Sequence, residues 1–110
     1  MLKKDFRLQK SVDYKIIYKN GHFYSGQFLR LGILKDYSSH RKIGIIVSKK
    51  IEKKASQRNF HKRQIRDIIN LLLSSMDSGY RMVIILKNKP DSFQSLQKDL
   101  IQCLKKAALL

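Results

Sequence analysis

Apolar residues alternate with small or polar residues in two short segments, 28–34 and 42–48, and this period of two predicts β-strands. In the first segment one face carries Leu29, Leu31 and Ile33, and the other carries Phe28, Arg30 and Gly32. Since only a short polar turn at 36–40 separates the segments, the two strands are expected to pair as an antiparallel hairpin. A third segment, 82–86, is apolar on both faces, as in a central strand covered on two sides.

Helical spacing of apolar residues predicts three helices. The first is expected to start at an N-cap on Ser11 and to stop at Asn20-Gly21, where glycine tolerates the left-handed conformation. The longest runs from about Ser56 to Met76, and its buried stripe is His61, Ile65, Ile68, Ile69, Leu72, Leu73 and Met76. The last follows a capping box formed by Asp91 and Gln94, and its inward residues are Phe93, Leu96, Leu100, Cys103, Leu104 and Ala107.

The order of these elements, α-β-β-α-β-α, predicts an α+β protein in which one mixed sheet and a layer of helices form a two-layer α/β sandwich. A chain of 110 residues without a repeat or a Pro-rich linker is expected to form a single domain, residues 1–110. The unit that links the 42–48 strand through the long helix to the 82–86 strand would be a right-handed crossover by the general rule.

The charge is strongly unbalanced, with 24 Lys and Arg against 8 acids and a formal net charge of +16. Such an excess repels itself in the compact state, so it favours a protein that binds a polyanion; the alternative is an inert, highly charged surface. Cys103, the single cysteine, excludes an internal disulfide and indicates a reducing compartment. No apolar run is long enough for a signal peptide or a membrane span, so we expect a soluble cytoplasmic protein without a membrane partner. Binding of a basic amphipathic helix to an anionic membrane surface is the weaker alternative.

One third of the cationic residues lie between Lys49 and Arg66, where Glu52 is the one acid. Arg58, Lys62 and Arg66 form a ladder of like charges at a spacing of four, which costs a helix about 0.2–0.5 kcal/mol per pair. Arg58 also lies in the first turn, where the helix dipole disfavours a cation. Among these residues only the pair Arg63–Asp67 is placed to compensate. An anion bound at this surface would make both the charge ladder and the cation at the helix start favourable.

Nucleic-acid phosphate is the anion that these residues suit best. The free N–H groups of a helix N-terminus bind phosphate oxygens, and arginine can hold a phosphate with two parallel hydrogen bonds. Asn59 can add a contact to phosphate, sugar or base. A solvated charged face is the alternative interpretation of the same pattern.

Aromatic side chains provide a second indication. Tyr14 and Tyr18 are one turn apart on the first helix, and Phe28 shares an open strand face with Arg30. Aromatic residues beside basic ones can stack on unpaired bases, although core packing explains each of these positions nearly as well.

No arrangement typical of a catalytic or metal site is present. The eight acids are scattered, the three histidines lack ligand spacing, and one thiol cannot complete a zinc site. The glycine patterns of nucleotide-binding loops are missing. We therefore expect no catalytic residue and no metal site in the chain itself.

Residues 42–67 resemble the signature region of the bacterial ribonuclease P protein subunit. In that family a strand ending in Val-Ser-Lys-Lys leads across a short loop into Ala-x-x-Arg-Asn-x-x-Lys-Arg-x-x-Arg followed by an acid. The matching residues here are Val47, Ser48, Lys49, Lys50, Ala55, Arg58, Asn59, Lys62, Arg63, Arg66 and Asp67. Arg7-Leu8 and the spacing of Tyr14, Tyr18 and Gly21 fit as well. The chain departs at 52–54, where the loop is one residue longer and lacks the usual glycine.

The resemblance implies three helices around a mostly antiparallel sheet of about four strands, with a left-handed crossover. It also implies the protein half of a ribonucleoprotein endoribonuclease that removes the 5′ leader from precursor tRNA. The RNA subunit would perform the catalysis with Mg²⁺, which it would mainly hold itself. The partners would be the catalytic RNA and precursor tRNA, with no obligate protein partner.

The resemblance further implies roles for particular residues. Those expected to contact the catalytic RNA are Lys49, Lys50, Lys53, Lys54, Arg58, Asn59, Lys62, Arg63 and Arg66. Those expected to line a cleft for the leader are Tyr14, Tyr18, Phe28, Arg30 and Ser48. One alternative is a ribosomal-type or general RNA-binding protein of the same fold. A second is a protein-only nuclease, although the scattered acids argue against it.

Overall fold

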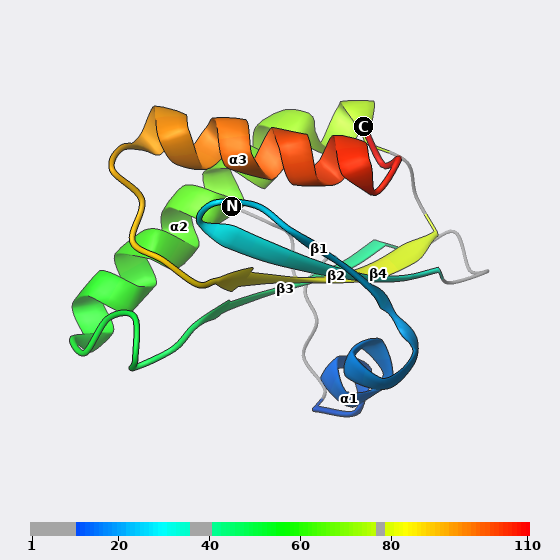
Figure 1. The fold of residues 1–110 in the computed structure, drawn as a ribbon, viewed down its shortest axis with the longest axis horizontal. Coiled ribbons are helices and arrows are strands. Elements are labelled where there is room, and N and C mark those ends of the chain that lie inside the picture. The colour runs from blue at the N-terminus through cyan, green and yellow to red at the C-terminus, as the bar shows by residue number, and fades with distance from the viewer. Residues whose placement is uncertain (1–10, 36–40, 77–78) are drawn as a thin grey trace.

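The computed structural model describes residues 11–35, 41–76 and 79–110. Helix α1 (Ser11–Asn20) precedes strands β1 (His22–Ser25), β2 (Leu29–Lys35) and β3 (Arg41–Val47). Helix α2 (Ala55–Leu72), a short 3₁₀ turn η2 (Leu73–Ser75), strand β4 (Tyr80–Leu86) and helix α3 (Phe93–Lys106) complete the chain (Figure 1). The predicted α+β class is confirmed. The expected turn at 36–40 and the capping side chain of Ser11 lie outside the described part of the chain.

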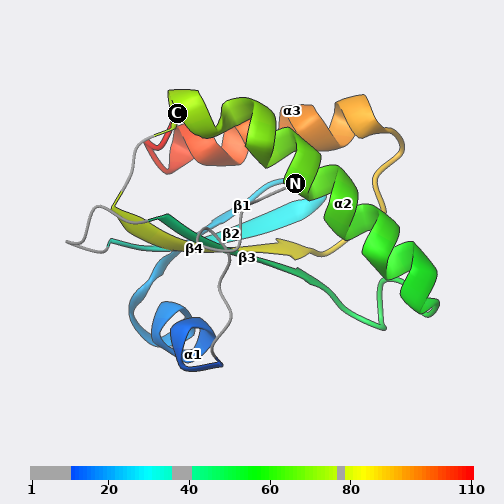
Figure 2. The same ribbon diagram turned by 180° about the vertical axis from the view of Figure 1, so that it is seen from behind.

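The four strands form one sheet in the order β1-β2-β4-β3. The predicted hairpin between the 28–34 and 42–48 segments is wrong, because β4 lies between them and pairs antiparallel with β2 and parallel with β3. The strand that is apolar on both faces takes a central position, where both faces can be covered. Figures 1 and 2 show the chain passing from β3 through α2 to β4 as a left-handed crossover, which the family resemblance implied and the general rule did not.

Strand β1 was not predicted from the sequence. It has four residues between Gly21 and Gly26, and it pairs antiparallel with β2 so that Phe23 lies opposite Gly32. Four residues are too few for an alternating pattern of apolar and polar residues to predict a strand. The pairing matters because it brings an aromatic ring onto the same sheet face as Arg30.

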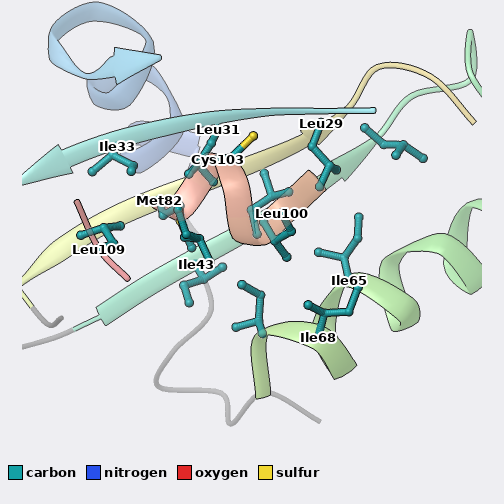
Figure 3. Packing of buried hydrophobic residues seen from close by; sticks show 14 of the residues in the cluster. Leu29, Leu31, Ile33, Ile43, Ile65, Ile68, Met82, Leu100, Cys103 and Leu109 are labelled. Atoms are coloured by element: carbon teal, nitrogen blue, oxygen red, sulfur yellow. The ribbon is translucent and has the colours of Figure 1, made fainter. Parts of the chain in front are cut away.

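Helices α2 and α3 cover one face of the sheet, and α1 lies on the other (Figures 1 and 2). The predicted sandwich of sheet and helices therefore holds, with α1 adding a partial cover on the second face. The main core lies under α2 and α3, and Figure 3 shows Ile65 and Ile68 of α2 and Leu100 and Cys103 of α3 packed with strand residues such as Leu29 and Met82. Burying one such side chain stabilises the fold by about 1.5–3 kcal/mol. Burial raises the pKa of the Cys103 thiol above its ordinary value of 9.0, and the nearby Asp99 carboxylate adds to this effect.

Two glycines leave room for aromatic rings on the sheet face that α1 covers. A Cβ atom on Gly44 would stand 2.4 Å from the Tyr14 hydroxyl oxygen, and one on Gly32 would stand 2.6 Å from the Phe23 ring. Ile17 and Val83, both fully buried, form the centre of this smaller cluster. The Tyr14 and Phe23 rings therefore pack over Gly44 and Gly32, where the strands carry no side chain.

The chain reversals and caps differ in detail from the predictions. The N-cap of α3 is Ser92, whose hydroxyl oxygen accepts a hydrogen bond from the Ser95 N–H at 3.1 Å, so the capping box at Asp91 is wrong. Phe93, expected to point inward, lies in the first turn and is 37% exposed. Helix α1 ends before Gly21 as predicted, but that glycine is required by close packing, because a Cβ would meet the carbonyl oxygens of Ile17 and Ile33.

Asp99 ties α3 to the β1–β2 connection. Its buried carboxylate accepts hydrogen bonds from the backbone N–H groups of Gln27, Phe28 and Leu29 at 2.7, 2.9 and 2.9 Å. Gly26 passes so close that a Cβ there would collide with the carboxylate oxygens. Three backbone N–H groups near the start of β2 therefore donate to one carboxylate on α3.

Candidate nucleic-acid interface

The cationic residues predicted to bind RNA form one surface along α2 and the loop before it. We call the following set the basic face: Lys49, Lys50, Lys53, Lys54, Arg58, Asn59, Lys62, Arg63 and Arg66. The loop lysines, Asn59 and Arg63 are exposed, and Arg58, Lys62 and Arg66 are half-buried. The opposite side of the helix carries the predicted buried residues His61, Ile65, Ile68 and Ile69. The expected division of α2 into a core side and a cationic side is confirmed.

Helix α2 begins without the groups that usually compensate its N-terminal dipole. Its N-cap is Lys54, no side chain of the described residues caps it, and its first turn contains no acid. The first turns project beyond the end of the sheet (Figure 1). Free N–H groups and cationic side chains at one exposed helix start make a local electrostatic preference for an anion.

Arg58 has a structural role that the sequence did not indicate. Its Nη1 donates hydrogen bonds to the carbonyl oxygens of Glu52 at 3.1 Å and Lys53 at 2.8 Å. The half-buried guanidinium therefore spans from the helix to the loop. The expected ion pair between Arg63 and Asp67 is not formed, although both residues lie in the described part of the chain.

Glu52 was not singled out from the sequence as more than the lone acid of the segment. Its Oε2 lies 3.0 Å from Nε2 of His61, and its Oε1 lies 3.3 Å from Nζ of Lys89. The hydrogen bond with His61 is the main cause of a lowered pKa for Glu52, partly opposed by desolvation and reinforced by Lys89. The carboxylate thus joins the loop to α2 and to the connection between β4 and α3.

The lowered pKa of Glu52 predicts how stability changes with pH. A carboxyl group whose pKa is depressed by folding stabilises the folded protein above its unfolded pKa, here near 4.5, and loses that contribution as the pH falls through the folded value. Glu52→Gln should therefore lower the melting temperature at pH 7. The difference from the unsubstituted chain should vanish in acid below the folded pKa. A difference that stayed constant across this acid range, measured by circular dichroism, would contradict the assignment.

The aromatic residues predicted for the leader cleft are divided between the two sheet faces. Tyr18, 50% exposed, stacks on Phe23 with ring centroids 5.9 Å apart and planes 13° from parallel. The guanidinium carbon of Arg30 lies 4.4 Å from the centroid of the same Phe23 ring. Phe28 was wrongly placed on this surface, because it precedes β2 and packs in the main core at 6% exposure. Phe23 takes its place.

We call the surface beside α1 the aromatic face and define it by Tyr14, Tyr18, Phe23, Arg30, Ile46 and Ile85. Ile46 and Ile85 lie next to each other in the β3–β4 register, and Arg30 continues the same row from β2. Ser48, exposed just beyond β3, starts the turn that leads to the basic face. The two surfaces therefore lie on opposite faces of the sheet and are joined by the loop after β3.

Residues 11–35, 41–76 and 79–110 contain neither a metal-ligand cluster nor a membrane-spanning helix. No group of three or more His, Cys, Asp or Glu side chains in these ranges could hold a metal ion. Within the same ranges, no helix combines the length and the apolar character that crossing a membrane requires.

Comparison with known proteins identifies the family. The sequence model described as Ribonuclease P matches residues 2–108. The chain belongs to the ribonuclease P protein family. The ribonuclease P protein component of Pseudanabaena sp. is 40% identical over 114 residues, which cover 100% of this chain and 97% of that protein. That of Clostridium botulinum strain Loch Maree is 32% identical over 109 residues, covering 96% and 97% respectively.

Solved structures of ribonuclease P proteins share the fold. The Staphylococcus aureus protein superimposes with a TM-score of 0.88 at 28% identity, covering 96% of this chain and 98% of that one. The Thermotoga maritima protein gives a TM-score of 0.82 at 25% identity, and the match covers 91% of this chain and 96% of that one. These similarities cover nearly the whole chain, so the fold described above is that of ribonuclease P proteins.

Proposed function

We propose that this chain is the protein subunit of a ribonucleoprotein that removes the 5′ leader of precursor tRNA. In this proposal the basic face binds the catalytic RNA, and the aromatic face receives the leader strand. The RNA subunit performs the hydrolysis with Mg²⁺, and the protein contributes binding and orientation. Because tRNA matures in the cytoplasm of bacteria, the chain would act there.

The single observation that supports this proposal most is the composition of the basic face. Eight Lys and Arg side chains lie between Lys49 and Arg66, and the one acid among them, Glu52, is only 15% exposed and directs its carboxylate to His61 and Lys89. The outward side of the segment is therefore left with one sign of charge. A face selected only for stability would contain acids at the start of α2, where the dipole favours them.

Each part of the basic face has a distinct task in this proposal. Lys62, Arg63 and Arg66 follow one side of α2 and would bind successive phosphates of the RNA backbone. Asn59, one residue after Arg58, would add a hydrogen bond to phosphate, sugar or base. The exposed lysines at 49, 50, 53 and 54 would extend the same surface around the helix start.

The aromatic face suits a single strand because it combines a stacking surface with a cation. Half of Tyr18 is open to solvent, so its outer ring face is available to a base, while Phe23 supports the ring from below. Arg30 would bind a phosphate of the same strand from its place over Phe23. Ser48 would add a hydroxyl contact where the strand approaches the loop. Tyr14, packed on Gly44, mainly fixes α1.

Mg²⁺ enters this proposal as an ion held by RNA. Among residues 11–35, 41–76 and 79–110, no group of three or more acidic, histidine or cysteine side chains could hold a metal ion, and Mg²⁺ is commonly bound through phosphate oxygens with only one or two carboxylates. No chemical step is therefore assigned to a metal bound by the protein.

A general RNA-binding role is the second candidate, because phosphate contacts alone do not choose between RNAs. To separate the two functions, the tagged chain would be purified from the cells that encode it and the bound RNA sequenced. Strong enrichment of ribonuclease P RNA over ribosomal RNA supports the proposal. Enrichment of ribosomal RNA without ribonuclease P RNA would favour a ribosomal-type protein.

A further inference from the structure

Glu52 is the one acid among the charged residues between Lys49 and Arg66, and its side chain contacts two other parts of the protein. Its two carboxylate oxygens contact different elements, with His61 on α2 at 3.0 Å and Lys89 after β4 at 3.3 Å. His61 is buried on the core side of the helix, whereas the Lys89 side chain is largely exposed. The carboxylate therefore points into the protein, away from the surface on which the lysines stand.

The backbone of Glu52 is hydrogen-bonded as well as its side chain. The Glu52 N–H donates to the carbonyl oxygen of Ser48 at 3.1 Å, and the Glu52 carbonyl oxygen accepts from Nη1 of Arg58 at 3.1 Å. Arg58 also binds the carbonyl oxygen of Lys53. The loop between β3 and α2 is thus fixed at its start, at its middle and at the first turn of the helix.

We propose that Glu52 is a positioning residue for RNA binding: its carboxylate fixes the loop against α2 so that the loop lysines and Arg58 are arranged before the RNA arrives. We call the contacts among Glu52, His61, Arg58 and Lys89 the Glu52 latch. A loop that is already ordered loses less conformational entropy on binding than one that must be ordered by the RNA. This inference rests on the proposed RNA-binding function of the basic face.

Simple electrostatics and the positioning role predict opposite effects when Glu52 loses its charge. An acid beside a phosphate-binding surface repels the RNA, so Glu52→Gln should strengthen binding if charge alone matters. If the latch positions the loop, the same substitution should weaken binding, because His61 and Lys89 lose the negative charge of their partner and the loop is held less firmly. The sign of the change therefore distinguishes the two explanations.

The experiment compares two variants that remove one negative charge each from the same region. Binding of a transcribed ribonuclease P RNA would be measured as a function of salt for the unsubstituted chain, Glu52→Gln and Asp67→Asn. Asp67 is exposed on α2 and takes no part in the latch, so its substitution should leave binding equal or tighter. Glu52→Gln should weaken binding about three- to tenfold, within the range for residues of one network. Its salt slope should fall by about one contact, roughly 0.7–0.9 units.

A second substitution tests the same contact from its other end and guards against loss of folding. His61→Leu puts an apolar side chain at a buried position of α2, which should keep the helix packed while breaking the hydrogen bond to Glu52. The single variant should weaken RNA binding to a similar extent. The double variant Glu52→Gln, His61→Leu should be no weaker than either single one, and circular dichroism would check that all variants remain folded.

Three results would overturn the inference: Glu52→Gln binding as tightly as Asp67→Asn, Glu52→Gln weakening binding without a parallel loss for His61→Leu, or additive losses in the double variant. Failure of the proposed function is recognised separately. In that case the unsubstituted chain itself would not bind the RNA at any salt concentration tested.

Discussion

Replacing Asp99 by alanine should lower the free energy of unfolding by about 3–5 kcal/mol, the largest effect we expect from a single substitution. The change leaves the N–H groups of Gln27, Phe28 and Leu29 without their acceptor in a buried or partly buried place. An unsatisfied buried donor costs about 1–3 kcal/mol, and hydrogen bonds to a charged group are the stronger kind. Since small domains are stable by only about 5–15 kcal/mol, much of the stability would be lost.

Thermal unfolding followed by circular dichroism would measure this effect. A loss of this size corresponds to a fall of roughly 15–30 °C in melting temperature for a domain of this length. Asp91→Ala is the matched control, because it removes an exposed acid just before the same helix. It should change stability by no more than about 0.5 kcal/mol. Equal melting temperatures for the two variants would contradict the role given to Asp99.

Asp99 also links stability to the aromatic face. The three peptide groups that it binds lie in the β1–β2 connection and at the start of β2, and those strands carry Phe23 and Arg30. An exposed lysine, Lys106, adds a contact from α3 to the carbonyl oxygen of Ser25 at 3.3 Å. A partly destabilised Asp99→Asn variant should therefore lose order first in the hairpin that presents the aromatic face, and amide hydrogen exchange can locate that loss.

The second large effect concerns the basic face. A triple variant with alanine at Lys62, Arg63 and Arg66 should bind ribonuclease P RNA about 10²–10³ times more weakly at 0.1 M salt. Each phosphate contact contributes roughly 0.7–0.9 to the slope of log affinity against log salt, so three contacts amount to two or three decades at that concentration. The slope itself should fall by about two to three units. The fold should be kept, since alanine favours a helix and all three side chains lie off the core side.

A charge-matched triple variant outside the basic face controls for net charge. Alanine at Lys35, Lys98 and Lys105 also removes three positive charges, but from exposed positions on β2 and α3. Its salt slope should stay near that of the unsubstituted chain. Equal losses of RNA affinity in the two triple variants would mean that binding depends only on overall charge. That result would contradict a specific interface at the basic face.

The long helix and its division into two sides could be predicted from the sequence because the pattern is local. Residues at helical spacing share a face whatever the rest of the fold does, so Ile65, Ile68 and Ile69 were identified as core and Lys62, Arg63 and Arg66 as surface. The expected exposure of the cationic residues followed from the same geometry. Their role in binding RNA remains a prediction that the affinities above would test.

The sheet order could not be derived from alternation, because alternation assigns faces and does not assign neighbours. Strands β2 and β3 are close in sequence, yet β4 separates them in space. Its apolar residues on both faces indicated a central strand, and that indication should have outweighed the short connection between β2 and β3.

Long-range polar contacts were missed for a related reason. Asp99 binds residues 70 to 72 positions earlier, and Glu52 binds Lys89, so neither contact leaves a local pattern. Phe28 was misplaced because strand alternation was extended one residue beyond the start of β2. Phe23 could have been found from the two aromatic residues between Gly21 and Gly26 and from a glycine, Gly32, in the next strand that leaves room for a ring.

Reconstituted leader removal is the most direct test of the central claim, that this chain assists RNA-catalysed maturation of tRNA. Precursor tRNA and ribonuclease P RNA would be incubated at a low Mg²⁺ concentration with and without the folded chain, and the rate of 5′ leader release measured. We expect the unsubstituted chain to accelerate release, the α2 triple variant to lose most of that effect, and the chain without RNA to release no leader. Absence of acceleration by the folded chain with its cognate RNA, or cleavage by the protein alone, would contradict the account.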